Sequence, residues 1–326
     1  VPGIYILEED GYGLRPNIGI RGATAERSSK ITLLEDGVMI APAPYSNPAA
    51  YYFPTASRMH TIEVLKGAPL LRYGPQTTGG VVNLISTPIP EETAGTLNLS
   101  YGQNAEADLL ANFGARSGNF GVLLETAQRR SDGFKDIDGS GRDTGYDISD
   151  YVVKLAWETE KQSLNFKAQY SEETSDETYL GLTDADFDRD EDRRYGLSAP
   201  DVMDNDHQGY NLVYRLQLAD NINMTATGYY NEFARNWYKL SGGSSLIAAA
   251  NNGDTFARGV LDGSEDIDGL SYKNNNREYE SRGVELNFDM GFGRHQFAVG
   301  ARVHEDEMDR FQPVDIYNQI DGELVY

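Results

Sequence analysis

The 326-residue sequence contains no cysteine and no long hydrophobic run. Without cysteine it can form neither a disulfide nor a thiolate metal site, which suits an oxidising compartment but does not establish one. Its mean hydropathy is -0.53, and no stretch approaches the ~18 apolar residues that a membrane helix needs. Helical membrane proteins are therefore excluded.

Proline is almost absent from the later part of the chain. Ten of the twelve prolines lie in residues 1–90, where seven acidic and seven basic side chains balance, and residues 91–326 carry the whole net charge of -23. Because two close prolines cannot sit in a central strand, Pro88 and Pro90 predict a boundary between a domain at 1–90 and a domain at 91–326. The acidic second domain argues against a nucleic-acid partner.

Residue groupings typical of enzymes are lacking as well. The four histidines show no metal-ligand spacing, and neither a Ser/His/Asp grouping nor a phosphate-binding loop stands out. The sequence therefore predicts a protein that is not an enzyme and has no resident cofactor.

The later region does contain a period-two pattern. From Leu164 to Tyr170, apolar side chains alternate with Asn165, Lys167 and Gln169, which gives a strand one apolar and one polar face. Several such segments reach the ~9 to 11 residues with which a tilted strand crosses a bilayer. About nine strands are predicted, at 95–102, 108–116, 119–131, 149–158, 163–172, 207–219, 222–235, 277–290 and 294–304.

The connections between these strands distinguish a membrane barrel from a soluble β-sandwich, which the alternation alone would also describe. Tight turns alternate with long connections, so one rim of the sheet carries turns and the other carries loops, as in outer-membrane barrels. Sandwiches rarely sustain this asymmetry. The turns lie at 117–119, 159–162, 220–221 and 291–293, and the long connections at 132–148, 173–206, 236–276 and from 305 onward.

The region from 62 to 90 reads IEVLKGAPLLRYGPQTTGGVVNLISTPIP, with NIGIRG at 17–22 and LLEDG at 33–37 upstream. These motifs resemble the plug domain of TonB-dependent outer-membrane receptors, most closely the ferric-citrate type. The resemblance implies a mainly β fold: a partial transmembrane antiparallel β-barrel of about nine strands, with an N-terminal α+β plug domain in its lumen. Short β-runs at 31–34, 62–65 and 81–85, broken by glycine and proline, suit such a globular insert.

The resemblance also implies that the chain is a fragment. No TonB box precedes Val1, the first half of the plug is missing, and about nine strands are too few to enclose a plug. Because a membrane does not tolerate the unpaired edges of an open sheet, we expect the fragment not to transport by itself.

Several residues acquire roles from the resemblance. In receptors of this type, arginines such as Arg21 and Arg72 meet barrel carboxylates, although either could pair within the plug instead. The proline-rich loop at 41–48 resembles an apical plug loop that faces incoming ligand through Tyr45 and Asn47.

Two further plug residues, Thr32 and Gln76, match positions that touch ligand in ferric-citrate receptors. Hydroxyl and amide groups suit citrate oxygens, although each could be purely structural. From the barrel, Arg193 and Arg194 are hypothesised to line the site, and alanine at both should weaken chelate uptake. Their connection is strongly acidic, which argues against anionic cargo unless its carboxylates face solvent or lipopolysaccharide.

Two acidic clusters could bind Ca²⁺. One contains Asp136, Asp138 and Asp143, and the other covers 184–192. Both lack the twelfth-position glutamate of a calcium loop, so a solvated loop is the alternative for each.

The function implied by the resemblance is active import across the outer membrane of a Gram-negative bacterium, by a receptor that is monomeric when complete. Ligand is captured outside, and TonB of the inner membrane drives plug movement. The expected cargo is a ferric chelate of citrate or a related siderophore, with iron as cargo and not as cofactor. Cobalamin, haem or an oligosaccharide are alternatives within the family, and a passive barrel serving as adhesin or phage receptor or a soluble β-sandwich binding module are alternatives outside it.

Overall fold

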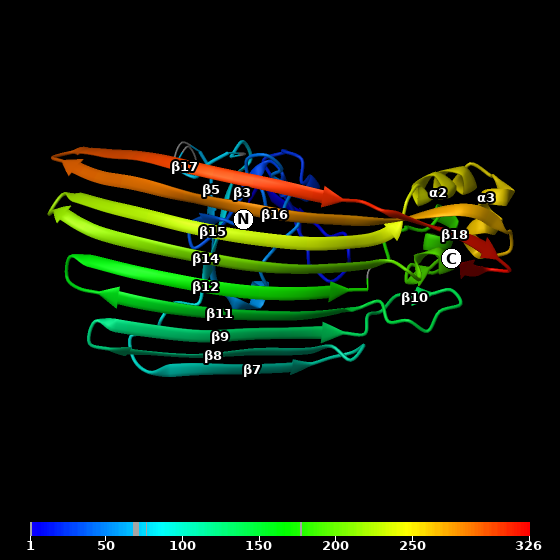
Figure 1. The fold of residues 1–326 in the computed structure, drawn as a ribbon, viewed down its shortest axis with the longest axis horizontal. Coiled ribbons are helices and arrows are strands. Elements are labelled where there is room, and N and C mark those ends of the chain that lie inside the picture. The colour runs from blue at the N-terminus through cyan, green and yellow to red at the C-terminus, as the bar shows by residue number, and fades with distance from the viewer. Residues whose placement is uncertain (1, 68–71, 76, 177) are drawn as a thin grey trace.

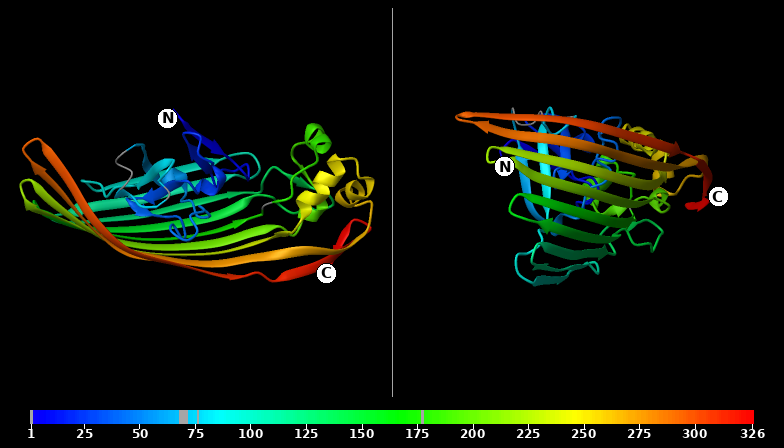
Figure 2. Two further views of the ribbon diagram at one scale, coloured as in Figure 1. Left: turned by 90° about the horizontal axis from the view of Figure 1, so that it is seen from above. Right: turned by 60° about the vertical axis from the view of Figure 1, so that its left-hand side comes forward.

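The structure, a computed structural model, describes residues 2–67, 72–75, 77–176 and 178–326. It has two parts: a long curved sheet that begins at Ala94, and a smaller N-terminal part (Figure 1). The smaller part lies against the concave side of the sheet (Figure 2). No helix within the described ranges is long and apolar enough to cross a membrane.

The N-terminal part contains two small sheets. Strands β1 and β2 pair antiparallel, and a four-stranded sheet has the order β4-β3-β6-β5. β3 and β6 are parallel, so a long crossover must separate them in sequence. The three β-runs predicted in this region are confirmed. The elements are β1 (Ile4–Leu7), β2 (Asn17–Ile20), η1 (Glu26–Ser28), β3 (Ile31–Glu35), β4 (Val38–Met39), η2 (Ala56–Arg58), β5 (Met59–Leu65) and β6 (Gly80–Ser86).

The double glycine before β6 has a packing reason. A Cβ at Gly79 would lie 2.9 Å from the carbonyl oxygen of Lys30, and one at Gly80 would lie 2.9 Å from Ile20. Real Cβ atoms do not approach so closely, so only glycine lets β6 begin against β2 and β3.

The main hydrophobic core lies inside the N-terminal part and extends to the long sheet. Its buried residues come from β2, β3 and β6, and Phe233 and Tyr279 of the long sheet join them. The two parts therefore share one core. Its plug-side members are Ile18, Ile20, Ile31, Leu33, Ile40, Ala43, Ala50, Tyr52, Val82 and Leu84.

The long sheet is the wall. Its described strands follow the order β19-β18-β16-β15-β14-β12-β11-β9-β8-β7, and β17 pairs with β16. All neighbours in it pair antiparallel, and tight turns lie at one end with long connections at the other (Figure 1). The fold class expected from the sequence, a partial barrel with a plug, is confirmed. The wall strands are β7 (Ala94–Tyr101), β8 (Ala107–Ser117), β9 (Phe120–Ser131), β11 (Tyr146–Glu158), β12 (Gln162–Ser175), β14 (Val202–Ala219), β15 (Ile222–Leu240), β16 (Ile267–Phe292), β17 (His295–Phe311), β18 (Val314–Ile320) and β19 (Glu323–Val325).

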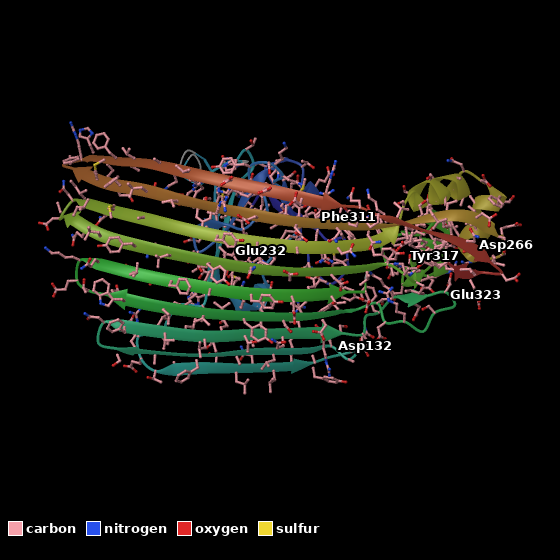
Figure 3. All side chains as sticks on the ribbon, in the orientation of Figure 1. Asp132, Glu232, Asp266, Phe311, Tyr317 and Glu323 are labelled. Atoms are coloured by element: carbon pink, nitrogen blue, oxygen red, sulfur yellow. The ribbon has the colours of Figure 1, made fainter. Side chains whose placement is uncertain are left out.

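Alternation divides the wall into two faces. Leu155, Leu212 and Val284 are exposed on the convex face, while Lys167 and Arg235 are buried on the face toward the plug. Toward the loop end the convex face changes from apolar to polar side chains. In β15, Tyr230 is followed on this face by Glu232, which is labelled in Figure 3. An apolar band with tyrosine and carboxylates beyond it is the order of a membrane-spanning strand and its interface.

Some strands are longer than the sequence predicted. β14 begins at Val202, β15 ends at Leu240 and β16 begins at Ile267, several residues beyond the apolar alternation. These extensions mix polar residues such as Asp204 and Asn236 with buried apolar ones such as Trp237, so the period-two signal weakens although the backbone pairing continues. β18 and β19 were not predicted.

The loop end carries its own small core. We call residues 178–201, 241–266 and 314–325 the loop cap. Leu180, Tyr195, Leu197, Val260 and Tyr272 are among its buried residues, so these long connections pack together with the strand ends. Its short elements are α1 (Asp184–Arg189), β13 (Arg193–Arg194), η4 (Gly196–Ser198), α2 (Gly243–Asn251) and α3 (Thr255–Asp262), and β10 (Asp136–Ile137) pairs with β13.

Candidate ligand-binding site and plug contacts

A buried group of ionised side chains joins the plug to the wall. Arg58, at the end of η2, donates to Glu35 of β3 at 2.7 Å and to Asp150 of β11 at 3.0 Å. Lys167 of β12 lies 3.0 Å from Glu35 and 2.7 Å from Asp36. We call these five residues the central ion cluster.

The central ion cluster is almost completely removed from solvent. Arg58 and Glu35 are each 1% exposed. Burial by itself would raise the pKa of Glu35, but Arg58 and Lys167 together hold the pKa well below its ordinary value. The pKa of Asp36 is lowered as well, because Lys167 and Lys154 outweigh its burial. Both plug carboxylates are therefore ionised at neutral pH and attract the wall.

The proline-rich plug loop at 41–48 contacts the edge of the wall. Asp306 of β17 accepts hydrogen bonds from the backbone N–H groups of Tyr45 at 2.8 Å and Ser46 at 3.2 Å. Asn47 donates to the sulfur of Met308 at 3.5 Å. The loop is thus fixed by wall side chains as well as by its prolines.

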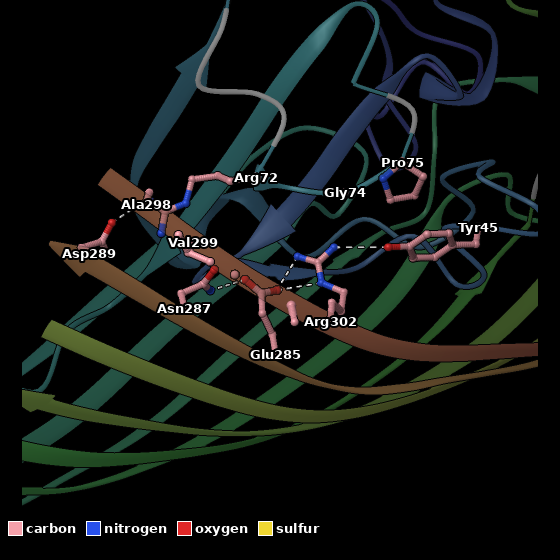
Figure 4. A pocket seen from close by; sticks show the side chains of 12 residues that line it. Tyr45, Arg72, Gly74, Pro75, Glu285, Asn287, Asp289, Ala298, Val299 and Arg302 are labelled. Atoms are coloured by element: carbon pink, nitrogen blue, oxygen red, sulfur yellow. Dashed lines mark hydrogen bonds and ion pairs between the residues drawn. The ribbon is translucent and has the colours of Figure 1, made fainter. Parts of the chain in front are cut away.

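A cavity of about 520 Å³ lies beneath this loop (Figure 4). Tyr45, Arg72 and Pro75 of the plug form one side, and residues of β16 and β17 form the other. Arg302 pairs with Glu285 and donates a hydrogen bond to the Tyr45 hydroxyl at 3.4 Å. Each cation lining this cavity therefore already has a carboxylate partner, since Arg72 lies 3.6 Å from Asp289.

Three arginines form a row across the wall on the face toward the plug. Arg235 of β15 is the register partner of Arg277 of β16, which is in turn the partner of Arg310 of β17. Arg235 is 2% exposed, and its guanidinium lies 3.9 Å from the ring centroid of Tyr51 of the plug. We call these three arginines the basic row.

The basic row lacks counterions among the described residues. None of its three members makes an ion pair with them, and the buried Nε and Nη2 of Arg235 and the buried Nε of Arg277 have no hydrogen-bond partner there. Lys239 and Lys273 form the next cationic pair toward the loops. Like charges directly opposite one another are unfavourable in a sheet, and a buried unpaired cation is more so.

Chemically, the basic row is suited to an anion with several oxygen atoms. Guanidinium groups present forked N–H donors that match carboxylates, and such charge-assisted bonds are stronger than neutral ones. In a chain of net charge -23, five neighbouring cations without an acidic partner in the described part of the chain are an exception that anion binding would explain.

The comparisons with known proteins agree with this architecture. Residues 1–81 match the family model described as the TonB-dependent receptor plug domain. With 23% identity, the crystal structure of the unliganded ferric citrate transporter FecA superposes with a TM-score of 0.76 over 99% of this chain and 46% of that one. The fold is that of a TonB-dependent receptor.

Other proteins to which the chain is similar are named for different cargoes. The ferric preacinetobactin receptor BauA from Acinetobacter baumannii is 16% identical, with a TM-score of 0.69 over 99% of this chain and 47% of that chain. The vitamin B12 transporter BtuB of Vibrio vulnificus strain CMCP6 is 29% identical over 179 residues, which are 54% of this chain and 26% of that protein. The chain thus spans about a quarter of the curated relative and just under half of the solved receptors.

The two arginines singled out in the N-terminal part from the sequence lie in different settings. Arg72 lies 3.6 Å from Asp289 of the wall, with both side chains partly exposed. Arg21 is exposed, has a φ of 54° and makes no ion pair with any described residue. A wall contact of Arg21 stays a prediction.

The described ligand-contact residues expected in the plug lie in different settings. Thr32 is 5% exposed, and its hydroxyl donates to the carbonyl of Pro75. Gln76 lies outside the described residues. Tyr45 and Asn47 contact β17, as described above. Ligand contact by these four residues stays a prediction.

Arg193 and Arg194 belong to the loop cap. Arg193 lies 2.8 Å from Asp138, 3.2 Å from Asp186 and 3.3 Å from Asp262. Arg194 donates to Thr178 and to the backbone carbonyls of Glu191 and Arg193. Both guanidinium groups therefore have partners within the loops, and their proposed contact with cargo stays untested.

The acidic residues considered for calcium meet only around Arg193, where Asp138 and Asp186 each pair with the guanidinium. Asp138 pairs with Arg193, while Asp136 and Asp143 are exposed. Within the described ranges no group of three acidic or histidine side chains is placed to hold a metal ion. In the second cluster, Asp186 is 1% exposed and accepts from Tyr195 at 2.7 Å, so it serves the loop core.

Sequence reasoning missed the residues that carry the most buried charge. Arg58 lies in ASRMH, which has no motif character, and Arg235 and Arg277 lie in predicted strands as ordinary polar alternation. A usable signal existed for the wall: Arg235 ends one predicted strand and Arg277 begins the next, so antiparallel pairing of the two strands places these arginines opposite one another.

Proposed function

We propose that the protein acts in the outer membrane of a Gram-negative bacterium as a TonB-dependent importer of an anionic ferric chelate, with citrate or a related siderophore as the chelator. In this proposal residues 1–90 are plug and residues 91–326 are barrel wall. The complete receptor is a monomer in lipid and lipopolysaccharide, iron is cargo, and TonB supplies the energy because the sequence has no nucleotide site.

The observation that carries the proposal is the basic row beside the plug. Arg235 is buried without a counterion in the described chain and borders Tyr51. A polycarboxylate chelate offers the oxygens that these guanidinium groups lack, and the approach from the loop end passes the cationic pair Lys239 and Lys273. The likeness in fold to the ferric citrate transporter FecA and the ferric preacinetobactin receptor BauA supports the same class of cargo.

Cobalamin is the second candidate cargo, because the curated relative is named a vitamin B12 transporter. Cobalamin would need no row of unpaired cations, so the two cargoes differ in their dependence on Arg235 and Arg277. An adhesin or phage receptor would bind its partner at the loops and would need neither the basic row nor TonB.

The test is equilibrium binding by the full-length protein in detergent, followed by growth of a receptor-deficient strain. Ferric citrate should bind, and the double variant Arg235→Gln with Arg277→Gln should reduce its affinity at least about tenfold. Arg282→Gln is the matched control, because Arg282 is exposed and pairs with Glu305 on the convex face. Binding of cyanocobalamin without binding of ferric citrate would replace the cargo proposal, and growth that is independent of TonB would favour a passive barrel.

A further inference from the structure

One short plug segment connects the basic row with the central ion cluster. It runs from Tyr51 to Arg58. At its start the ring of Tyr51 lies 3.9 Å from the guanidinium of Arg235, and at its end Arg58 is bonded to Asp150 and Glu35. Eight consecutive residues therefore join the candidate cargo site to the strongest buried contact between plug and wall.

The segment is packed against its surroundings except at Ala56 and Ser57, which are exposed. Tyr52 stacks on His207 of β14 with ring centroids 3.8 Å apart and planes at 14°. Pro54 and Thr55 are buried, and η2 then leads directly into Arg58. Proline removes backbone freedom, so a displacement at one end of the segment is not absorbed by a flexible loop before it reaches the other.

Tyr51 contacts two cations. The guanidinium of Arg27 in the plug lies 5.4 Å from its ring, and that of Arg235 in the wall lies closer, at 3.9 Å. Arg27 pairs with Glu9, whereas Arg235 makes no ion pair with a described residue. Besides a hydrogen bond from its Nη1 to the Asn275 carbonyl at 3.5 Å, Arg235 therefore has the ring face of Tyr51 as its partner, and it is one of the three guanidinium groups that an incoming anion would engage.

An anion at the basic row competes with this contact. A cation–π contact contributes about 0.5–2 kcal/mol, and a charge-assisted bond between guanidinium and carboxylate is stronger than a neutral hydrogen bond. When the guanidinium of Arg235 turns toward cargo, the ring of Tyr51 loses its partner. The equilibrium between the bound and released positions of the segment then shifts by the difference in interaction free energy between these two states.

We propose that Tyr51 is a positioning residue: its contact with Arg235 couples anion binding at the basic row to the position of the plug. Loss of the contact between Tyr51 and Arg235 loosens the segment and weakens the hold of Arg58 on Asp150 and Glu35, so that cargo binding prepares the plug for movement. The inference deepens the proposed function and rests on it for the identity of the anion. The contact itself does not depend on which anion binds.

The experiment uses a thiol introduced by Ser57→Cys into the full-length protein. Ser57 is exposed and precedes Arg58, and residues 1–326 contain no cysteine. With any cysteine in the rest of the full-length protein replaced by serine, a maleimide reports one position. Ferric citrate at saturation should raise the labelling rate at least about threefold. Arg235→Gln should raise the rate to a similar level with no cargo present, and this arm tests the inference even if ferric citrate does not bind.

Substitution of the tyrosine separates positioning from cargo contact. Tyr51→Leu should abolish the response of labelling to cargo and lower the maximal uptake rate about tenfold, while the affinity for ferric citrate changes less than about threefold. Tyr51→Phe keeps the ring face and should restore the response. Surface amounts of each variant are measured to correct for folding.

Two results would overturn the inference. One is unchanged labelling in Arg235→Gln, which would show that the segment does not respond to loss of the guanidinium. The other is a parallel loss of affinity and uptake in Tyr51→Leu, which would place Tyr51 in the cargo site itself. Failure of ferric citrate to bind the unmodified receptor would overturn the proposed cargo instead, and the labelling of Arg235→Gln would still decide the inference.

Discussion

Arg58 of the plug and Asp150 of β11 form an ion pair at 3.0 Å in which the two side chains are 1% and 4% exposed. The pair joins a segment without a recognisable motif to the middle of a long wall strand. Removal of one member of a buried ion pair leaves the other uncompensated, which costs about 3–5 kcal/mol.

Arg58→Ala should therefore lower the free energy of unfolding of the full-length receptor by about 3–5 kcal/mol. Urea unfolding in detergent measures the change. Arg72→Ala is the control, because the pair of Arg72 with Asp289 is 3.6 Å long and about half exposed, and such pairs contribute about 0–1 kcal/mol. Equal effects of the two substitutions would contradict the role of the central ion cluster.

Asp201 should make the stability of the loop cap depend on pH. Its side chain is 0% exposed and accepts from the backbone N–H groups of Tyr179 at 3.0 Å and Leu240 at 3.2 Å. Burial raises the pKa of Asp201 to about 7, against an unfolded value of about 3.9. The folded cap therefore binds the proton more tightly, so its stability is greatest below about pH 4 and falls as pH rises to about 7.

Hydrogen exchange of residues 178–201 at pH 5 and pH 8 measures this effect. Faster exchange is expected at pH 8, after correction for the intrinsic rate. Asp201→Asn should remove most of the difference because it cannot ionise, whereas Asp204→Asn, at an exposed neighbouring position, should retain it. A cap that is equally protected at both values would refute the prediction.

Gly145→Ala should disrupt the junction between β9 and β11. A Cβ at Gly145 would lie 1.7 Å from the carbonyl oxygen of Ser131, so the backbone must move, at a cost of about 1–3 kcal/mol. Gly228→Ala is the matched control, since nothing lies within 4 Å of the added carbon in the described chain. Heat-modifiability on gels reports folding of both variants, and an intact Gly145→Ala protein would contradict the packing.

Leu212→Arg should impair membrane insertion. Leu212 is 45% exposed on the convex face of β14, and an arginine facing the middle of a bilayer costs about 2–4 kcal/mol in a barrel. Asn211→Arg places the same charge on the opposite face of the strand and should insert more normally. Folding yield into lipid vesicles measures both, and indistinguishable yields would argue against contact of this face with hydrocarbon.

Much of the architecture was predictable because local pattern determined it. In β11 and β12 an apolar convex face alternates with a polar face, and their register pairs Tyr151 with Tyr170, so period two is visible in the sequence. The plug motifs at 62–90 were equally visible. The wall beyond the apolar band was not, because residues such as Asp204 and Asn236 are polar neighbours in paired strands with solvent on that face.

The candidate site was less predictable because it depends on register. Arg235, Arg277 and Arg310 lie on three strands, and only their alignment makes them one group. Arg193 was the more conspicuous residue in the sequence, beside another arginine in a long loop, but the fold brings Asp138, Asp186 and Asp262 to it. The partner of a charged residue is set by the tertiary structure, and the residues next to it in the sequence do not reveal it.

β16 is 26 residues long, more than twice the ~9 to 11 with which a tilted strand crosses hydrocarbon. In a barrel that spans a bilayer, much of this strand would therefore extend beyond the lipid, with its amide groups already paired with β15 and β18. Proteases would find few unpaired backbone segments to cleave along it. An antibody directed at the cell surface would bind its side chains as a flat, ordered epitope.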